Sequence, residues 1–277
     1  MANLACKEFL MANTVLIGQY RETNSVFHRL DPRTKILCII VLMLSFLMLE
    51  TFISYAIATI VVMGILLLSK IPLHVFVKGL KPLLLILIFT FLYQLVFTEG
   101  KVIWSYSFIE LTVEGLQNGI RFVWRIVLLI LLASMLTLTT KPLSLADALV
   151  KLLSPLSKIN VPVEQFSLMI VIAIRFIPTI LQELDRILLA QKARGYDLSS
   201  IPLLKRIFAY IPILIPLIFT IVQRAEQLTY AIDARAYGNG RGRTSYKQLK
   251  FQYIDYHVAF IVIIVVVILL IIKIWGI

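Results

Sequence analysis

The sequence predicts an all-α integral membrane protein with about five transmembrane helices and three further helices on the cytoplasmic side, two of them long. Of its 277 residues, 60% are hydrophobic and only 15% are charged, whereas soluble domains average about 45–50% apolar and about 25% charged residues. The mean hydropathy is +0.93. Long apolar runs alternate with polar stretches, and the basic residues gather in only some of those stretches.

Five apolar runs approach the length of about 20 residues that crosses a bilayer. The first two are interpreted as separate spans that turn at Glu50-Thr51, because a single bent element would break the charge pattern described below. The runs occupy residues 36–49, 52–68, 82–97, 122–138 and 258–272. The predicted regions are a cytoplasmic N-terminal segment (1–35), a four-helix transmembrane region (36–140), a cytoplasmic-side region (141–257) and a last transmembrane helix (258–277). Met1-Ala2-Asn3 recurs as Met11-Ala12-Asn13, so either methionine could be the natural start.

Lys and Arg fall mostly on one side of the membrane in this arrangement. Five precede residue 36, three lie in 69–81 and fifteen lie in 141–257, so 23 of the 27 share a face. Cytoplasmic loops carry an excess of Lys and Arg. The pattern therefore predicts a cytoplasmic N-terminus and an external C-terminus. The net charge of +12 is then explained by orientation in the lipid bilayer, and no nucleic-acid partner is expected.

The region 141–257 is too apolar for a soluble domain and too charged for plain spans. Helical spacing predicts an amphipathic helix at about 143–157, followed by long helices at about 163–195 and 202–237. Each long helix has an apolar first half and a charged second half. If both crossed the membrane, residues 182–206 with five cations would be external, against the charge rule. We therefore place both on the cytoplasmic side, with seven spans as the alternative.

The two long helices end in the same motif. Residues 190–196 read AQKARGY and residues 231–237 read AIDARAY, at a constant shift of 41 that extends back to Gln182 and Gln223. In each copy, small residues flank one arginine and leave its guanidinium as the only protruding group, able to pair with carboxylates or backbone carbonyls in a groove. The predicted site residues are Ala193, Arg194, Gly195, Ala234, Arg235 and Ala236.

The two tips differ at one position. The first has Gly195 where the second has Ala236. Because Gly favours the left-handed cap conformation, this difference predicts that the two helices end differently.

Motifs for catalysis or nucleotide binding are missing from the sequence. The one Gly-Lys pair, Gly100-Lys101, lacks the context of a phosphate loop, and the histidines and cysteines have no metal-ligand spacing. Arg121 and Arg125 are interpreted as residues of the external interface rather than of a substrate path. We expect a non-enzymatic chain without a cofactor or metal of its own, which acts through a cytoplasmic partner.

Three segments resemble a known family: SVFHRLDPRTK at 25–35, TTKPLSLADALVKLLSPL at 139–156 and the two Ala-Arg-small tips. They resemble the transmembrane T component of energy-coupling factor (ECF) transporters, an EcfT/CbiQ-like family that includes the cobalt-transport permease subunit. The resemblance runs from about Ile17 to the C-terminus. It implies a prokaryotic cell-membrane subunit that links two ABC-type ATPases, which hold ATP and Mg, to one small substrate-binding membrane subunit.

The resemblance also implies roles for the cytoplasmic-side helices. The two long helices would be crossed coupling helices, with Arg194 and Arg235 each entering a groove on one ATPase. Their apolar halves and the helix 143–157 would carry the substrate-binding subunit. The implied function is uptake of vitamins or other micronutrients, with a dedicated cobalt or nickel importer as the alternative. A stand-alone secondary transporter, which needs midplane polar sites or inverted repeats, and an intramembrane enzyme are weaker alternatives.

Overall fold

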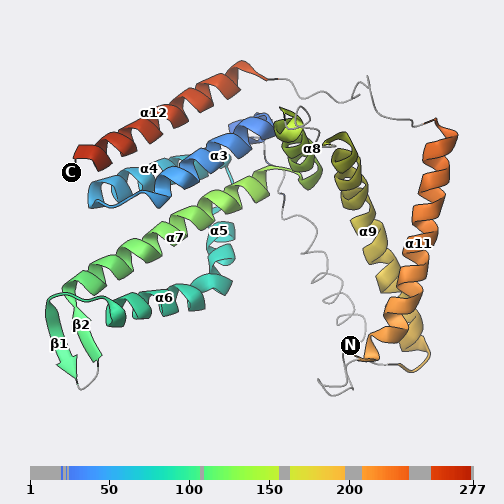
Figure 1. The fold of residues 1–277 in the computed structure, drawn as a ribbon, viewed down its shortest axis with the longest axis horizontal. Helices are drawn as coiled ribbons and strands as arrows, with labels where there is room; N and C mark the ends of the chain where they lie inside the picture. The colour runs from blue at the N-terminus through green and yellow to red at the C-terminus, as the bar shows by residue number, and fades with distance from the viewer. Residues whose placement is uncertain are drawn as a thin grey trace. The chain divides into compact units, whose positions relative to one another are not determined.

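The computed structural model describes residues 20, 23, 25–106, 109–155, 163–196, 208–236 and 251–275, so the question of Met1 or Met11 lies outside it. The described chain is helical except for one two-stranded antiparallel sheet (Figure 1). It divides into two compact units. The first is Met1–Ala148 with Leu249–Ile277, and the second is Leu149–Gln248.

The first unit contains most of the helices that the sequence predicts as spans. Its elements are α2 (Val26–Arg29), α3 (Pro32–Leu47), α4 (Phe52–Ser69), α5 (Leu73–Leu80), the 3-10 helix η1 (Lys81–Leu83), α6 (Leu84–Phe97), β1 (Val102–Tyr106), β2 (Ile109–Thr112), α7 (Val113–Thr139) and α12 (Tyr253–Trp275). Helix α8 (Pro142–Leu153) begins in the first unit and ends in the second.

Polar residues fix where the helices of this unit begin. The Asp31 side chain accepts a hydrogen bond from the Arg33 backbone N–H, and Pro32 occupies the first turn of α3. The Thr112 hydroxyl accepts from the Gly115 N–H at the start of α7 and donates to the Thr98 carbonyl at the end of α6. Such caps satisfy backbone groups that a helix end leaves without an internal partner.

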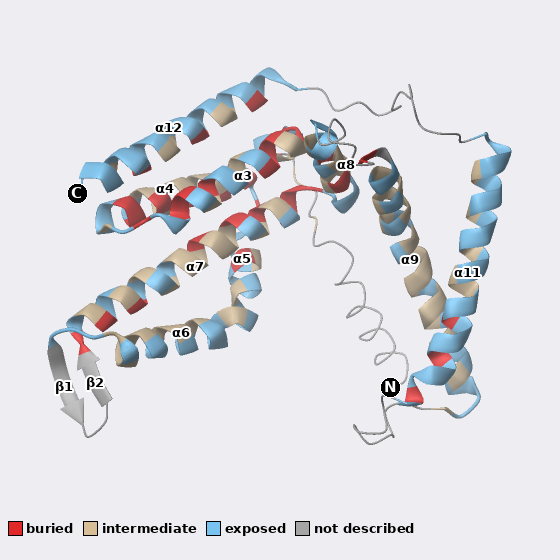
Figure 2. Ribbon diagram, viewed as in Figure 1, coloured by how far each residue is buried: buried red, intermediate tan, exposed pale blue. Residues whose placement is uncertain are grey.

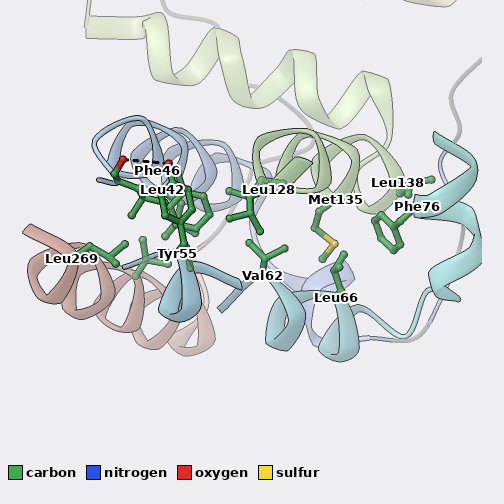
Figure 3. Packing of buried hydrophobic residues seen from close by; sticks show 14 of the residues in the cluster. Leu42, Phe46, Tyr55, Val62, Leu66, Phe76, Leu128, Met135, Leu138 and Leu269 are labelled. Carbon is green, nitrogen blue, oxygen red and sulfur yellow. Dashed lines mark hydrogen bonds between the residues drawn. The ribbon is translucent and has the colours of Figure 1, made fainter. Parts of the chain in front are cut away.

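The core of the first unit is a set of single apolar stripes (Figure 3). In α4 the buried residues follow helical spacing, so that one face packs inward and the others do not. Figure 2 shows this burial concentrated on α3, α4 and α7. The stripes include Leu42 and Phe46 of α3, Tyr55, Val62 and Leu66 of α4, Phe76 of α5, Leu128, Met135 and Leu138 of α7, and Leu269 of α12.

The remaining faces of these helices are exposed and apolar. In α6, Leu85 is 75% exposed and Phe89 is 67% exposed, although the helix is almost wholly hydrophobic. Exposed leucine and phenylalanine over whole helix faces is what hydrocarbon tails rather than water would cover. The all-α integral membrane fold predicted from the composition is confirmed.

Within the described part of the chain, six helices are long and apolar enough to cross a membrane: Phe52–Ser69, Leu73–Phe97, Val113–Thr139, Gln165–Ala193, Ile211–Ala234 and Tyr253–Trp275. Four of them contain predicted spans. The predicted span at 36–49 is not among the six, because α3 has only 16 residues. The two long helices of the 141–257 region are among them by length and composition, so their place on the cytoplasmic side stays a prediction from charge.

The segment 98–120, between the apolar runs 82–97 and 122–138, contains regular structure of its own. Strands β1 and β2 form an antiparallel pair within it, with Val102 opposite Thr112 and Tyr106 opposite Ile109. The strand sequences VIWSY and IELT are rich in β-branched and aromatic residues. Helix α7 then begins at Val113, nine residues before the apolar run at 122.

A buried polar cluster joins the ends of three helices in the first unit. Asp255 of α12 accepts from the Asp31 N–H at 2.9 Å and from the Gln252 N–H at 2.7 Å. The Lys35 ammonium donates to the Thr139 carbonyl at the end of α7, at 3.1 Å. Burial lowers the pKa of Lys35 to about 8, against the opposing pull of Asp255 and Asp31. In the sequence Lys35 is one of the five basic residues before residue 36, whereas in the structure it binds the C-terminus of α7.

Candidate coupling site

The two predicted tips lie on α9 (Val163–Ala193) and α11 (Ile211–Ala234), which form most of the described part of the second unit. The predicted helix 163–195 ends close to the observed end. For the predicted helix 202–237, residues 202–207 and 237 lie outside the described part. The predicted amphipathic helix at 143–157 corresponds to α8, which ends at Leu153.

Helices α9 and α11 run antiparallel and cross (Figure 1). Three contacts establish the direction. The Tyr196 hydroxyl donates to the Ala209 carbonyl at 2.9 Å, the Gln191 side-chain amide donates to the Pro212 carbonyl at 3.4 Å, and Arg224 Nη2 lies 3.2 Å from Glu183 Oε2. As the residue number falls along α9 it rises along α11. The helices then diverge toward the amino end of α9 and the carboxyl end of α11.

The first tip closes α9 with a complete Schellman motif. The Gly195 N–H donates to the Lys192 carbonyl at 3.0 Å, and the Tyr196 N–H donates to the Gln191 carbonyl at 3.0 Å. Gly195 has φ +81°, the left-handed conformation that this motif requires. Arg194 is therefore the last residue before the chain turns away from the helix axis.

The second tip has the same left-handed position after its arginine and one of the same two closing bonds, so the predicted difference in helix ending is wrong at this position. Residue 237, which would make the other bond, lies outside the described part. Ala236 has φ +50°, although it carries a Cβ. Its N–H donates to the Asp233 carbonyl at 2.8 Å, which is the bond that Gly195 makes to Lys192, shifted by 41 residues. The prediction rested on the preference of glycine for the left-handed position, but an alanine occupies that position here.

The structure exposes both arginines and keeps them apart. Ala193, Arg194 and Gly195 are exposed at the end of α9, and Ala234, Arg235 and Ala236 are exposed at the end of α11. Neither guanidinium has a hydrogen bond or ion pair with any residue in the described ranges. Because the helices are antiparallel, the six predicted site residues form two separate tips at opposite ends of the pair, not one cluster.

Two side chains at the first tip have a role that the sequence did not indicate. Gln191 and Tyr196 hold the end of α9 to the chain at Pro212 and Ala209. The repeat-equivalent of Gln191 is Ile232, which has no side-chain donor. Position 191 is one of the variable positions of the repeat, so only the contact with Pro212 reveals its role.

The apolar halves of both long helices are exposed. No residue from 165 to 193 is buried, and only Ile213 and Leu217 are buried in α11 (Figure 2). Exposed large apolar side chains lie on both helices, among them Phe166, Met169 and Ile177 of α9 and Leu214, Ile218 and Phe219 of α11. A surface of this size on a folded protein indicates contact with lipid or with another protein.

Comparison with known proteins gives consistent matches over most of the chain. A family model described as "CbiQ: Cobalt transport protein" matches residues 23–246. Proteins named "Energy-coupling factor transporter transmembrane protein EcfT" are similar in sequence. The one from Ruminiclostridium cellulolyticum is 41% identical over 91% of this chain and 95% of its own, and the one from Lactococcus lactis subsp. cremoris is 40% identical over 95% and 98%.

The Bacillus subtilis protein of the same name is 40% identical over 86% of this chain and 91% of its own. The range matched by the family model includes α2 to α11 and both tips. With the family model covering residues 23–246, these relatives show that this multi-pass membrane chain belongs to the CbiQ family, as a transmembrane component of an energy-coupling factor transporter.

Proposed function

We propose that this chain is the energy-coupling scaffold of an ECF importer that takes up vitamins or other micronutrients. In this proposal Arg194 and Arg235 each dock into a groove of one of two ABC-type ATPases, which form a homo- or heterodimer. The ATPases bind ATP and Mg, and this chain holds no cofactor of its own. The observation that carries the proposal is the pair of exposed tips, each with a left-handed residue directly after its arginine.

The geometry of the tips supports docking. A left-handed residue directly after the arginine turns the chain aside, so the guanidinium projects from the end of the helix. The alanine before it and the glycine or alanine after it add almost no bulk. A guanidinium in such a position can make paired hydrogen bonds to a carboxylate or to backbone carbonyls in a narrow groove.

The exposed apolar halves of α9 and α11, with α8, support the second part of the proposal. They provide a hydrophobic surface on which a small substrate-binding membrane subunit can pack. ATP-driven closure of the two ATPases changes the angle between the long helices, and this movement tilts the bound subunit. The chain itself performs no chemical step.

Charge reversal at the tips tests this function. We expect Arg194→Glu and Arg235→Glu each to weaken ATPase association by about 2–5 kcal/mol, as removal of one partner from a buried charged contact does, and to reduce substrate uptake. The double variant is expected to lose the ATPases on purification. Lys192→Glu, an equal change of charge at an exposed neighbour, is the matched control and is expected to retain them. Wild-type recovery of ATPases with the double variant would contradict the proposal.

A dedicated cobalt or nickel importer is the second candidate, favoured by the description of the matching family model as a cobalt transport protein. Purification of the complex from native membranes, with identification of its other subunits, separates the two candidates. A vitamin-binding membrane subunit supports the first, and a metal-binding one supports the second.

A further inference from the structure

The contact between Glu183 and Arg224 differs from the two other side-chain contacts described above for α9, those of Gln191 and Tyr196. Its two residues are 41 positions apart, which is also the shift that aligns the two tips. Glu183 on α9 and Arg224 on α11 are therefore equivalent positions of the internal repeat, and they face one another. The Gln191–Pro212 and Tyr196–Ala209 contacts join positions only 21 and 13 apart.

Equivalent positions of an antiparallel pair can meet at only one place. If a two-fold axis relates the two helices, each residue faces its own equivalent where the axis passes between them, and nowhere else. Glu183 and Arg224 are such equivalents in contact, so an axis that related the two helices would pass between them. Arg194 lies 11 residues after Glu183, and Arg235 lies 11 residues after Arg224. At 1.5 Å per residue, each tip is about 16 Å along its helix from the axis.

We propose that the Glu183–Arg224 ion pair is the pivot about which α9 and α11 change their crossing angle, and that it positions the two tips. This inference rests on the proposed function. A contact on the axis is kept at any angle, whereas contacts away from it must lengthen or break when the angle changes. Because the arms are equal, rotation about this point moves the two arginines by equal distances.

The charges at the pivot suit a contact that must survive rotation. Glu183 Oε2 lies 3.2 Å from Arg224 Nη2 across the helices and 3.5 Å from Arg186 Nη1 on its own helix. The Glu183 side chain is only 20% exposed and that of Arg224 is 37% exposed, whereas that of Arg186 is 75% exposed. The contact is both a hydrogen bond and an ion pair. Charge attraction depends on distance, so it remains when a change of angle bends the hydrogen bond.

Arg186 would complicate an exchange of the two charges, and the repeat indicates the remedy. Its equivalent on α11 is Gln227. In an Arg186→Gln background, Glu183→Arg and Arg224→Glu each break the pair, and the two together restore it in reverse. Glu183→Gln removes the charge with little change of shape. Glu226→Arg, an equal change of charge at an exposed position of α11, is the matched control.

The experiment measures the distance between spin labels beside the tips, at Lys192→Cys and Asp233→Cys, in the full-length chain with Cys6 and Cys38 replaced by Ala. The chain is studied in lipid nanodiscs, alone and together with its co-purified partner subunits. Each single change at the pivot, including Glu183→Gln, is expected to broaden the distance distribution and shift its mean. The charge exchange restores the parent distribution, and Glu226→Arg leaves it unchanged.

The same variants are assayed for transport in the complete complex. We expect the single changes to keep the ATPases bound and to lower uptake per ATP hydrolysed by about fivefold or more, the lower end of typical coupling between sites. An unchanged distance distribution in the single variants, an equal broadening by Glu226→Arg, or no recovery by the exchange would overturn the pivot. Loss of the proposed function is a separate result, recognised by ATPase binding that survives the double change at Arg194 and Arg235.

Discussion

At the scale of single residues, Ala236 holds a backbone conformation that a glycine holds at the matching position of the first tip. A Cβ in the left-handed region costs about 1–2 kcal/mol relative to the right-handed one. No atom lies within 4 Å of the place that a Cβ would take on Gly195. The difference between the two tips is therefore one of backbone strain and not of space.

We expect Gly195→Ala to destabilise the end of α9 by about 1 kcal/mol, because it adds left-handed strain where no new contact compensates. Ala236→Gly is expected to change the end of α11 in the opposite direction by less, since glycine also gains freedom in the open state. Hydrogen exchange of the backbone amides of residues 194–196 and 235–236 measures both effects. Protection that changes with the same sign in the two variants would contradict this reading.

The residue scale also shows the limits of prediction from the sequence. The repeat located Arg194 and Arg235, and the structure leaves both exposed as expected. The left-handed alanine could not be predicted, because propensity makes glycine the default at that position and only the folded backbone reveals an exception. Likewise, in the sequence Lys35 cannot be distinguished from the other basic residues before residue 36, and only three-dimensional packing brings it to the Thr139 carbonyl.

At the scale of elements, Arg125 ties α7 to the turn between α3 and α4. Its Nη2 donates to the Leu49 carbonyl, its Nε donates to the Tyr55 hydroxyl at 3.2 Å, and the Tyr55 hydroxyl itself donates to Leu49. From the sequence, Arg125 was interpreted as a residue of the external membrane interface. Its contacts instead give it a structural part in joining three helices, which agrees with its exclusion from a substrate path.

Arg125→Met is expected to lower the free energy of unfolding by about 1.5–3 kcal/mol, because hydrogen bonds to a charged group are lost and the Leu49 carbonyl loses its charged donor. Thermal unfolding of the purified chain in one detergent measures the change. Arg121→Met is the comparison, since the Arg121 guanidinium stacks over the Phe52 ring at 4.8 Å and its Nε is buried without a hydrogen bond in the described structure. An effect at Arg121 as large as that at Arg125 would show that the turn does not depend on these bonds.

Helix boundaries were predictable to the extent that local signals set them. Asp31-Pro32 and Thr112 stand at observed helix starts, as capping residues do. Continuous apolar runs located α4, α7 and α12, because a helix that crosses a bilayer needs about 20 apolar residues. The sheet at β1 and β2 was missed because its strands are only five and four residues long, too short for periodicity to distinguish them from a loop.

At the scale of the whole molecule, the number of spans is decided by α9 and α11. Both are long and apolar enough to cross a bilayer, yet crossing would put residues 182–206 and their cations on the external side. The two arrangements agree on the side of the second tip and of the C-terminus. They disagree on the first tip, so Lys192 distinguishes them.

We expect five spans, with both tips on the cytoplasmic side, because the positive-inside preference is strongest in loops close to the membrane. Single cysteines at Lys192, Asp233 and Ile274 in a chain without Cys6 and Cys38 test this with a maleimide that cannot cross membranes. In intact cells Ile274→Cys is expected to react, whereas Lys192→Cys and Asp233→Cys react only after permeabilisation. If both Lys192→Cys and Ile274→Cys react in intact cells while Asp233→Cys does not, the chain has seven spans. The first tip would then be external, out of reach of any ATPase. If Asp233→Cys reacts in intact cells and Ile274→Cys does not, the whole chain has the opposite orientation. The three positions together therefore determine both the number of spans and their direction.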